Sequence, residues 1–205
     1  MSLTQQLIFL FSALGALNGF LLSGYFLLKN GEKRLSDYFL GGLLAMLSIR
    51  VIKSVFLFFN RHLFEYFIIL GLTACLLIGP FLYLYTRSSV GKPVRYWWLH
   101  LLPYILVMAA FSSVYSYYEE RYLWGWFVEG IYKQWLIYVL LSAYVLRNTI
   151  KRLFKKDEKL VASEIWQLNV LGGTALIWLA YDSSDYTSYI VGALSFTFIL
   201  YINLV

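Results

Sequence analysis

Seven long apolar runs, separated by short clusters of charged residues, constrain this chain more than any other feature of its sequence. Runs of this length match what an α-helix needs to cross the hydrocarbon core of a bilayer. Transmembrane strands would instead show stretches of about ten residues that alternate in hydrophobicity, and the sequence has no such stretches. The sequence therefore predicts an all-α, polytopic membrane protein. We expect its transmembrane helices over residues 6–28, 37–59, 65–85, 97–117, 130–146, 164–181 and 186–205.

The composition agrees with a membrane protein. The 205 residues are 60% hydrophobic and 14% charged, whereas a soluble domain is about half apolar and a quarter charged. The net charge of +6 would suggest nucleic-acid binding in a soluble protein, but here the basic residues lie mostly between apolar runs. The run over residues 7–28 has no basic segment before it and no small-residue cleavage site, which favours a helix over a signal peptide. We expect one transmembrane domain over residues 1–205.

The distribution of Lys and Arg predicts the orientation of the chain. The loops after the first, third and fifth predicted helices carry three, three and six of these residues, whereas the loops after the second, fourth and sixth carry one, one and none. Basic residues gather in cytoplasmic loops. We therefore expect the amino terminus outside and the carboxyl terminus in the cytoplasm, with all seven helices alternating in direction.

Two basic residues, Arg50 and Lys53, lie inside the second apolar run. A charged side chain at that depth is costly, and such residues mark functional sites in many membrane proteins. Arg50 lies near the middle of the predicted helix, and Lys53 lies on the same face, about 4–5 Å nearer the outer surface. The acids that could approach them are Glu129 and Asp182 or Asp185, at the outer ends of the last three predicted helices.

Two interpretations of this cation pair remain open. In the first, Arg50 and Lys53 form a ligand-binding or gating site with Glu129 and Asp182, in a cavity that accepts an anionic or lipidic ligand from the outer side. In the second, Arg50 is structural and bonds to carbonyls and to interior polar groups such as Asn18 or Asn169. A separate ion pair between Glu129 and Lys133, four residues apart on one helix, is also expected.

Small residues predict where helices approach each other closely. Gly15, Gly19 and Ser23 recur every four residues along the first helix, a spacing that suits either packing within the chain or a dimerisation face. Gly79-Pro80 predicts a kink or local break in the third helix.

Aromatic residues predict the boundaries of the membrane. We expect Trp97 and Trp98, and also Trp124 and Trp126 in the connection before the fifth helix, at the level of the lipid headgroups.

The sequence contains no motif of an enzyme, a metal site or a cofactor site. It lacks a paired-carboxylate motif in a helix and the zinc, nucleophile-elbow and phosphate-loop motifs. The one cysteine, Cys75, lies in an apolar run and is expected to pack in the core. His62 and His100 fall on opposite sides of the predicted topology, so we expect no metal. The last helix has no Lys that could hold a retinal Schiff base. We expect no enzyme and no cofactor.

Three stretches resemble a known family. The segment IGPFLYLYTRS over residues 78–88 resembles a "GPxLYxYxRS" pattern, and WLHLLPY over residues 98–104 resembles "xLHxLPF". The first helix, with LNGFLLSGYFLL followed by a short basic turn, is also similar. Together they resemble the amino-terminal seven-helix sensor region of bacterial membrane-bound regulators that carry an AraC-type helix-turn-helix domain in the cytoplasm.

The resemblance implies a sensory, signal-transducing domain in the bacterial cytoplasmic (inner) membrane that relays an outer ligand, lipid or protein signal to a cytoplasmic transcription regulator. It also implies a homodimer. The chain has no helix-turn-helix module, so no direct nucleic-acid contact is expected from these residues. The apolar end, Tyr201–Val205, has no basic stop, and we expect a longer natural protein. The alternatives are a small-solute transporter or transporter subunit, and a non-catalytic subunit that docks a membrane protein partner.

Overall fold

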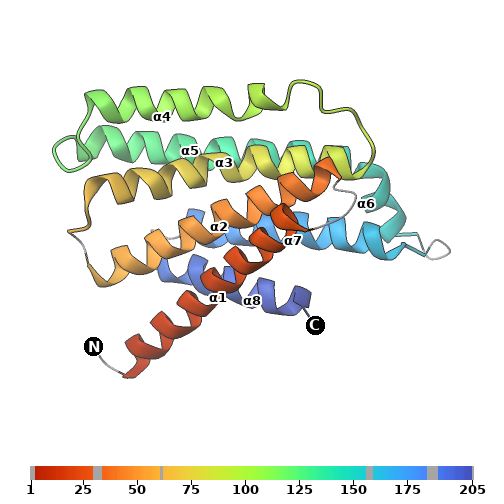
Figure 1. Ribbon diagram of the computed structural model, residues 1–205, viewed down its shortest axis with the longest axis horizontal. Coiled ribbons are helices and arrows are strands. Elements are labelled where there is room, and N and C mark those ends of the chain that lie inside the picture. The colour runs from red at the N-terminus through yellow and green to blue at the C-terminus, as the bar shows by residue number, and fades with distance from the viewer. Residues whose placement is uncertain (1–2, 30–33, 61, 156–158, 184–188, 205) are drawn as a thin grey trace.

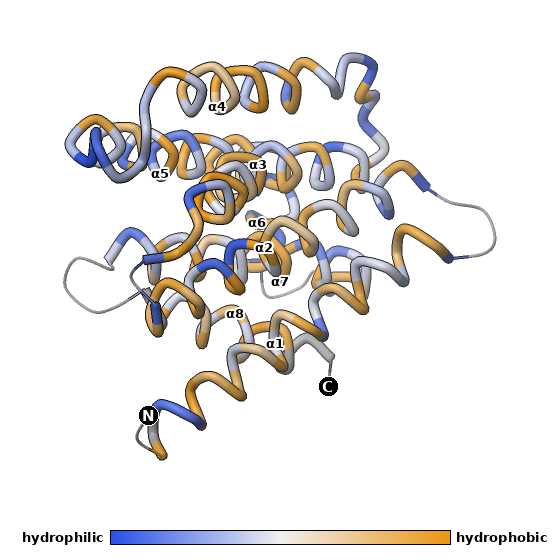
Figure 2. Tube along the Cα trace, turned by 60° about the vertical axis from the view of Figure 1, so that its left-hand side comes forward, coloured by the Kyte–Doolittle hydropathy of each residue, from blue (hydrophilic) through white to orange (hydrophobic). Residues whose placement is uncertain are grey.

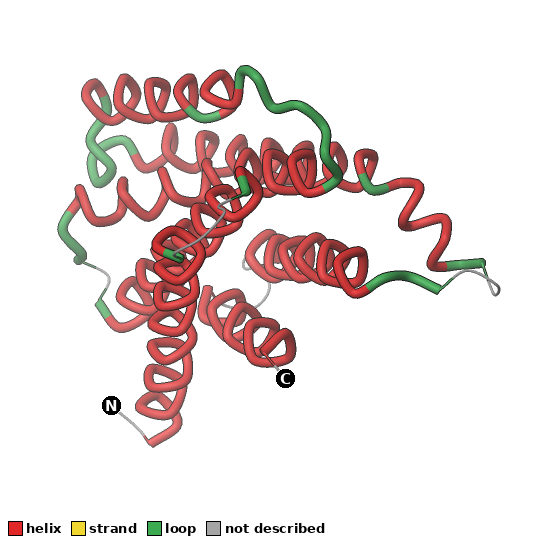
Figure 3. Tube along the Cα trace, turned by 45° about the vertical axis from the view of Figure 1, so that its right-hand side comes forward, coloured by secondary structure: helices red, strands yellow, loops and turns green. Residues whose placement is uncertain are grey.

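The computed structural model describes residues 3–29, 34–60, 62–155, 159–183 and 189–204. These residues form helices and loops, with no strand among them, as the sequence predicts (Figure 3). The elements are α1 (Leu3–Leu28), α2 (Leu35–Phe59), α3 (Glu65–Ser89), the 3-10 turn η1 (Trp97–His100), α4 (Leu102–Val114), α5 (Arg121–Val145), α6 (Arg147–Leu153), α7 (Ala162–Asp182) and α8 (Tyr189–Leu204).

The third helix is continuous through Gly79-Pro80, so the predicted local break is wrong, while the alternative prediction of a kink there stays a prediction. Pro80 lies inside α3 and is buried. Its neighbour Gly79 lets α5 approach closely, because a Cβ at that position would lie 2.9 Å from Cβ of Tyr138 and 3.3 Å from Cα of Trp135. The pair therefore serves helix packing rather than a break.

The predicted helix over residues 97–117 is divided. The turn η1 comes first, and the 13-residue helix α4 begins only at Leu102. Pro103 explains the restart, because proline lacks the N–H that an interior helical position needs but fits in the first turn. A turn then connects Tyr115 to Glu120.

The aromatic connection predicted before the fifth helix is itself helical. α5 begins at Arg121 instead of residue 130, so Trp124 and Trp126 lie on its first turns. Trp124 is only 1% exposed and packs edge-on against Phe111 of α4. Its indole donates a hydrogen bond of 3.2 Å to the carbonyl of Tyr115. Trp124 therefore packs between α5 and α4, whereas Trp97, Trp98 and Trp126 are exposed. Their position at the level of the lipid headgroups stays a prediction.

The helices form two packed groups (Figure 1). The first group is a row in which α1 packs on α2, α2 packs on α3, and α3 packs on both α4 and α5. The second group consists of α7 and α8 and packs against this row. Here α8 contacts α1 and α2, and α7 contacts α3, α5 and α8. The buried apolar side chains come from both groups of helices and meet around α2 and α3. The second and third helices are therefore central, while α4 lies at one edge.

The small residues of α1 pack within the chain. A Cβ on Gly15 would overlap Thr197 of α8, and a Cβ on Gly19 would lie 2.2 Å from the Ser48 hydroxyl of α2. The hydroxyl of Ser23 donates a 2.8 Å hydrogen bond to the carbonyl of Gly41. This stripe joins α1 to both α2 and α8.

Among the residues that the structure describes, four helical segments are long and apolar enough to cross a membrane: Gln5–Leu28, Leu35–Phe59, Glu65–Ser89 and Trp97–Val114, which joins η1 to α4. Many large apolar side chains are exposed on α1, α4 and the outer faces of α5 and α7. Hydrophobic residues run along most of the helices, and hydrophilic ones gather near helix ends and loops (Figure 2). These features indicate a membrane protein.

Candidate functional site

Arg50 lies in the centre of the molecule, on α2, and is 1% exposed. Its Nη1 donates a 2.8 Å hydrogen bond to the hydroxyl of Ser54, one turn further along the same helix. Its Nη2 donates a 2.6 Å hydrogen bond to the hydroxyl of Tyr132 on α5. The Ser54 hydroxyl itself donates to the Arg50 carbonyl at 3.0 Å, which orients its oxygen as an acceptor. Both partners of the guanidinium are therefore neutral hydroxyls.

An aromatic ring from a third helix covers the guanidinium. The Cζ atom of Arg50 lies 4.3 Å from the ring centre of Tyr181, at the end of α7. A cation above a tyrosine face is attracted by the ring's negative charge density. The same end of α7 is tied to α5, because the indole of Trp178 donates a 3.0 Å hydrogen bond to the Tyr132 carbonyl. Arg50 thus joins α2, α5 and α7.

Lys53 is also buried, with 3% of its surface exposed. Its stem lies against Gly71 of α3, where a Cβ would be 2.4 Å from Cγ of Lys53 and 2.5 Å from its Cβ. Glycine at this position therefore makes room for the lysine stem. Lys53 forms no hydrogen bond or ion pair with any residue in the described ranges.

The two cations lack a compensating negative charge. Within the part of the chain that the structure describes, no carboxylate lies within ion-pairing distance of Arg50 or Lys53. The Nε–H of Arg50 has no hydrogen-bond partner there either. The buried thiol of Cys75 also lies beside both cations. Buried charges are normally paired, whereas the described groups around Arg50 are neutral.

The predicted acids do not join the cluster. Glu129 forms an ion pair of 2.6 Å with Lys133, and their side chains are 52% and 69% exposed. This is the local pair expected from their spacing. Asp182 is exposed at the end of α7, although its neighbour Tyr181 covers Arg50. Asp185 lies outside the described residues. The structure therefore keeps Arg50 and Lys53 together and places Glu129 apart from them.

The polar groups that hold Arg50 differ from those expected. Asn169 is exposed on α7 and lines an apolar pocket described below, and Asn18 lies on α1. The acceptors are Ser54 and Tyr132 instead. Ser54 could have been found, since it lies four residues from Arg50 on one helix face. Tyr132 and Tyr181 had no such signal, because their helices meet α2 only through tertiary packing.

An apolar pocket adjoins the cluster. Its volume is about 110 Å³, and it lies between α1, α2, α7 and α8. On α2 it is lined by Leu40, Leu43, Leu44 and Leu47, and on α7 by Thr174 and Ile177 among others. Arg50 follows Leu47 on α2 by one helical turn, and Tyr181 follows Ile177 on α7 by one helical turn.

A second polar cluster lies between α3, η1 and α5. Nδ1 of His100 is 3.1 Å from the hydroxyl of Tyr138, to which the hydroxyl of Tyr104 donates at 3.2 Å. The imidazole also lies 5.2 Å from the ring centre of Tyr83, whose hydroxyl accepts from Nη1 of Arg87 at 2.8 Å. These groups satisfy one another, and they fix η1 against α3 and α5.

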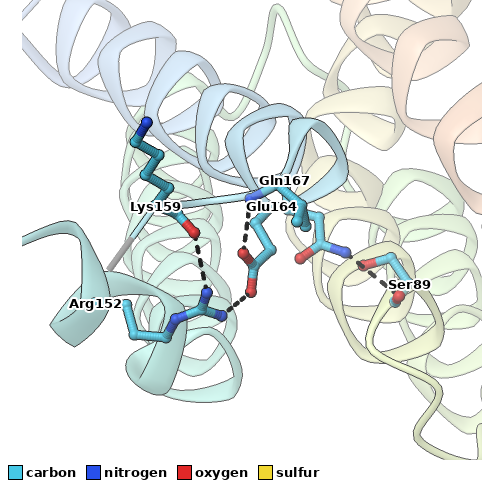
Figure 4. A network of polar contacts seen from close by, with 6 residues as sticks. Ser89, Arg152, Lys159, Glu164 and Gln167 are labelled. Carbon is cyan, nitrogen blue, oxygen red and sulfur yellow. Dashed lines mark hydrogen bonds and ion pairs between the residues drawn. The ribbon is translucent and has the colours of Figure 1, made fainter. Parts of the chain in front are cut away.

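A third polar network ties α7 to its neighbours at the opposite end from Tyr181 (Figure 4). Arg152 of α6 forms an ion pair of 2.5 Å with Glu164 and donates to the Lys159 carbonyl at 3.3 Å. Gln167 donates to the carbonyl of Ser89, at the end of α3, at 3.3 Å. These contacts anchor the start of α7, so its two ends have different partners.

Comparisons with known proteins add no family to this description: no family model, curated protein or solved structure matches the chain.

Proposed function

We propose that this chain is a membrane-embedded sensory domain that receives an anionic signal from the outer side and relays it to a cytoplasmic effector. In this proposal the seven apolar segments all cross the bacterial cytoplasmic membrane, with the amino terminus outside. The effector we propose is a transcription regulator, because the segments over residues 78–88 and 98–104 resemble those of membrane-bound regulators.

The observation that carries the proposal is the uncompensated pair of buried cations. Arg50 is held by two hydroxyls and a tyrosine ring, and Lys53 has no polar partner among the described residues. Burying two basic side chains without a carboxylate is costly. Apolar residues of similar size would serve a purely structural role at least as well, whereas basic side chains inside a membrane suit an anion-binding role.

The relay follows from which helices the cluster joins. An anion that binds Nε of Arg50 competes with the present contacts of the guanidinium, including the ring of Tyr181. Tyr181 in turn packs against α8, since a Cβ on Gly192 would lie 2.5 Å from its ring. Binding would therefore favour a second packing of α7 and α8 against α2 and α5. A ligand shifts such an equilibrium by its difference in affinity for the two packings.

The anchored start of α7 gives this motion a direction. Glu164 and Gln167 hold that end to α6 and α3. A displacement at Tyr181 would then pivot α7 about its start and move α8, which enters the cytoplasm at its carboxyl end in the proposed topology. The carboxyl end of α8 is the connection to an effector.

Hydrogen–deuterium exchange tests the relay in the full chain, reconstituted in phosphatidylcholine nanodiscs. We expect Arg50→Gln to speed amide exchange in α7 and α8 by about fivefold or more, the effect of roughly 1 kcal/mol of lost local stability. Lys133→Gln is the matched control, since it removes an exposed cation from α5. Faster exchange confined to α2 and α5 would contradict the proposal.

A further inference from the structure

We propose that the ligand of this site is a fatty-acid-type anion, with its carboxylate at Arg50 and Lys53 and its acyl chain in the apolar pocket between α1, α2, α7 and α8. This inference rests on the proposed function and names the chemical class of its ligand.

The pocket and the cation cluster lie one after the other along the same faces of α2 and α7. Along α2 the lining residues Leu40, Leu43 and Leu47 recur at helical spacing, and the next position on that face is Arg50. Along α7 the lining residues Thr174 and Ile177 are followed on the same face by Tyr181. The stacked pair of Arg50 and Tyr181, in which Cζ of Arg50 lies 4.3 Å from the ring centre, therefore lies one helical turn beyond the pocket on both helices.

The pocket and the cation cluster differ in chemistry as the two ends of a fatty acid do. The pocket is lined almost wholly by aliphatic and aromatic side chains, such as Leu43, Phe196 and Leu200. One helical turn beyond the α2 lining, Arg50 offers an unused Nε–H, and Lys53 lies one further turn along α2. A carboxylate matches the planar donor edge of a guanidinium. Its negative charge also offsets the buried positive charges.

The distance along α2 suits a single acyl chain. From Leu40 to Arg50 is ten residues of α2, or about 15 Å. In the proposed topology the start of α2 is cytoplasmic, so the chain would point inward and the carboxylate outward. An amphiphile in the outer leaflet has the same orientation. The bound ligand would differ from it in lying deeper, with its carboxylate near the centre of the membrane.

Binding of tritiated dodecanoate to the full chain in phosphatidylcholine nanodiscs, counted above empty nanodiscs at pH 8, tests the assignment. We expect saturable binding that unlabelled dodecanoate displaces. Dodecanol, which keeps the chain but lacks the charge, and acetate, which keeps the charge but lacks the chain, should each compete at least tenfold more weakly. This comparison uses the unaltered protein, so it does not depend on whether a variant folds.

Two matched pairs of variants locate the two ends of the ligand. Arg50→Gln should weaken dodecanoate binding at least tenfold, while Lys133→Gln leaves it unchanged. Val170→Phe, which fills the pocket from α7, should also weaken it at least tenfold. Leu176→Phe is its control, because Leu176 lies on the exposed face of the same helix.

The outcomes separate this inference from the function on which it rests. If acetate competes as well as dodecanoate and Val170→Phe has no effect, the acyl pocket is wrong and the anion site stands. If dodecanol competes as well as dodecanoate, or Arg50→Gln leaves binding intact, the carboxylate assignment is wrong. If dodecanoate does not bind but Arg50→Gln still speeds exchange in α8, the inference fails while the relay survives.

Discussion

Neutral groups hold the guanidinium of Arg50 on three sides, and each comes from a different position in the sequence. Ser54 and Tyr132 accept its hydrogen bonds, and the ring of Tyr181 covers its face. Hydroxyls and rings stabilise a cation less than a carboxylate does, so the arrangement keeps Arg50 buried without neutralising it. The guanidinium therefore keeps its positive charge inside the protein.

The hydrogen bond from Arg50 to Tyr132 can be tested directly. Tyr132→Phe removes the acceptor and leaves a buried, charged donor unsatisfied, which should lower the free energy of unfolding by about 1–3 kcal/mol. Tyr122→Phe removes an equal group from an exposed position on α5 and should change it little. Thermal unfolding in detergent micelles compares the two variants. Equal shifts would mean that the Tyr132 hydroxyl contributes nothing to the native state.

At the scale of the elements, close approach of helices decides where the cations lie. Gly71 lets α3 lie against the stem of Lys53, and Gly19 lets α1 lie against Ser48 of α2. Larger residues at these positions would separate the helices and open the core to solvent or lipid. The small residues of α1 and α3 are therefore part of what encloses α2.

Two glycine substitutions distinguish close packing from helix propensity. Gly71→Ala places a Cβ within 2.4 Å of the Lys53 side chain and should destabilise the protein by about 1–3 kcal/mol. Gly130→Ala, in α5, meets nothing within 4 Å and should stabilise it by about 0.5–1 kcal/mol. Chemical unfolding of both variants checks the signs. Stabilisation by Gly71→Ala would show that α2 and α3 are less closely packed than described.

At the scale of the whole molecule, the proposed sensor requires a defined orientation in the membrane. Glu119 precedes α5 and Lys155 follows α6, and both are exposed. In the proposed topology these positions lie on opposite sides of the membrane, Glu119 outside and Lys155 in the cytoplasm.

Cysteine labelling tests this orientation in intact cells. An impermeant maleimide should label Glu119→Cys before the cells are opened, and Lys155→Cys only afterwards. The native Cys75 is buried, so the unaltered protein serves as the background control. The reverse pattern would invert the topology, and with it the side from which a ligand reaches Arg50.

The sequence by itself determined the helical class, most helix boundaries and the presence of buried cations. Apolar runs of membrane length form helices wherever the surroundings are apolar, because backbone polar groups must then bond within the helix. Sequence patterns predicted helix boundaries less accurately near proline and aromatic residues. The third helix continues through Pro80, and α5 begins nine residues earlier than the pattern indicated, because burial of Trp124 against α4 stabilises its first turns.

Only the tertiary structure decided which groups meet Arg50 and Lys53. Glu129 has the charge to pair with them, but its position on α5 faces outward to Lys133, while Tyr132, three residues on, faces inward. That difference depends on how α5 is rotated against α3, which the packing of Gly79 against Trp135 and Tyr138 sets. Likewise, Tyr181 reaches Arg50 because α7 ends beside the middle of α2. Helix rotation and stagger result from side chains far apart in the sequence, so no local pattern encodes them.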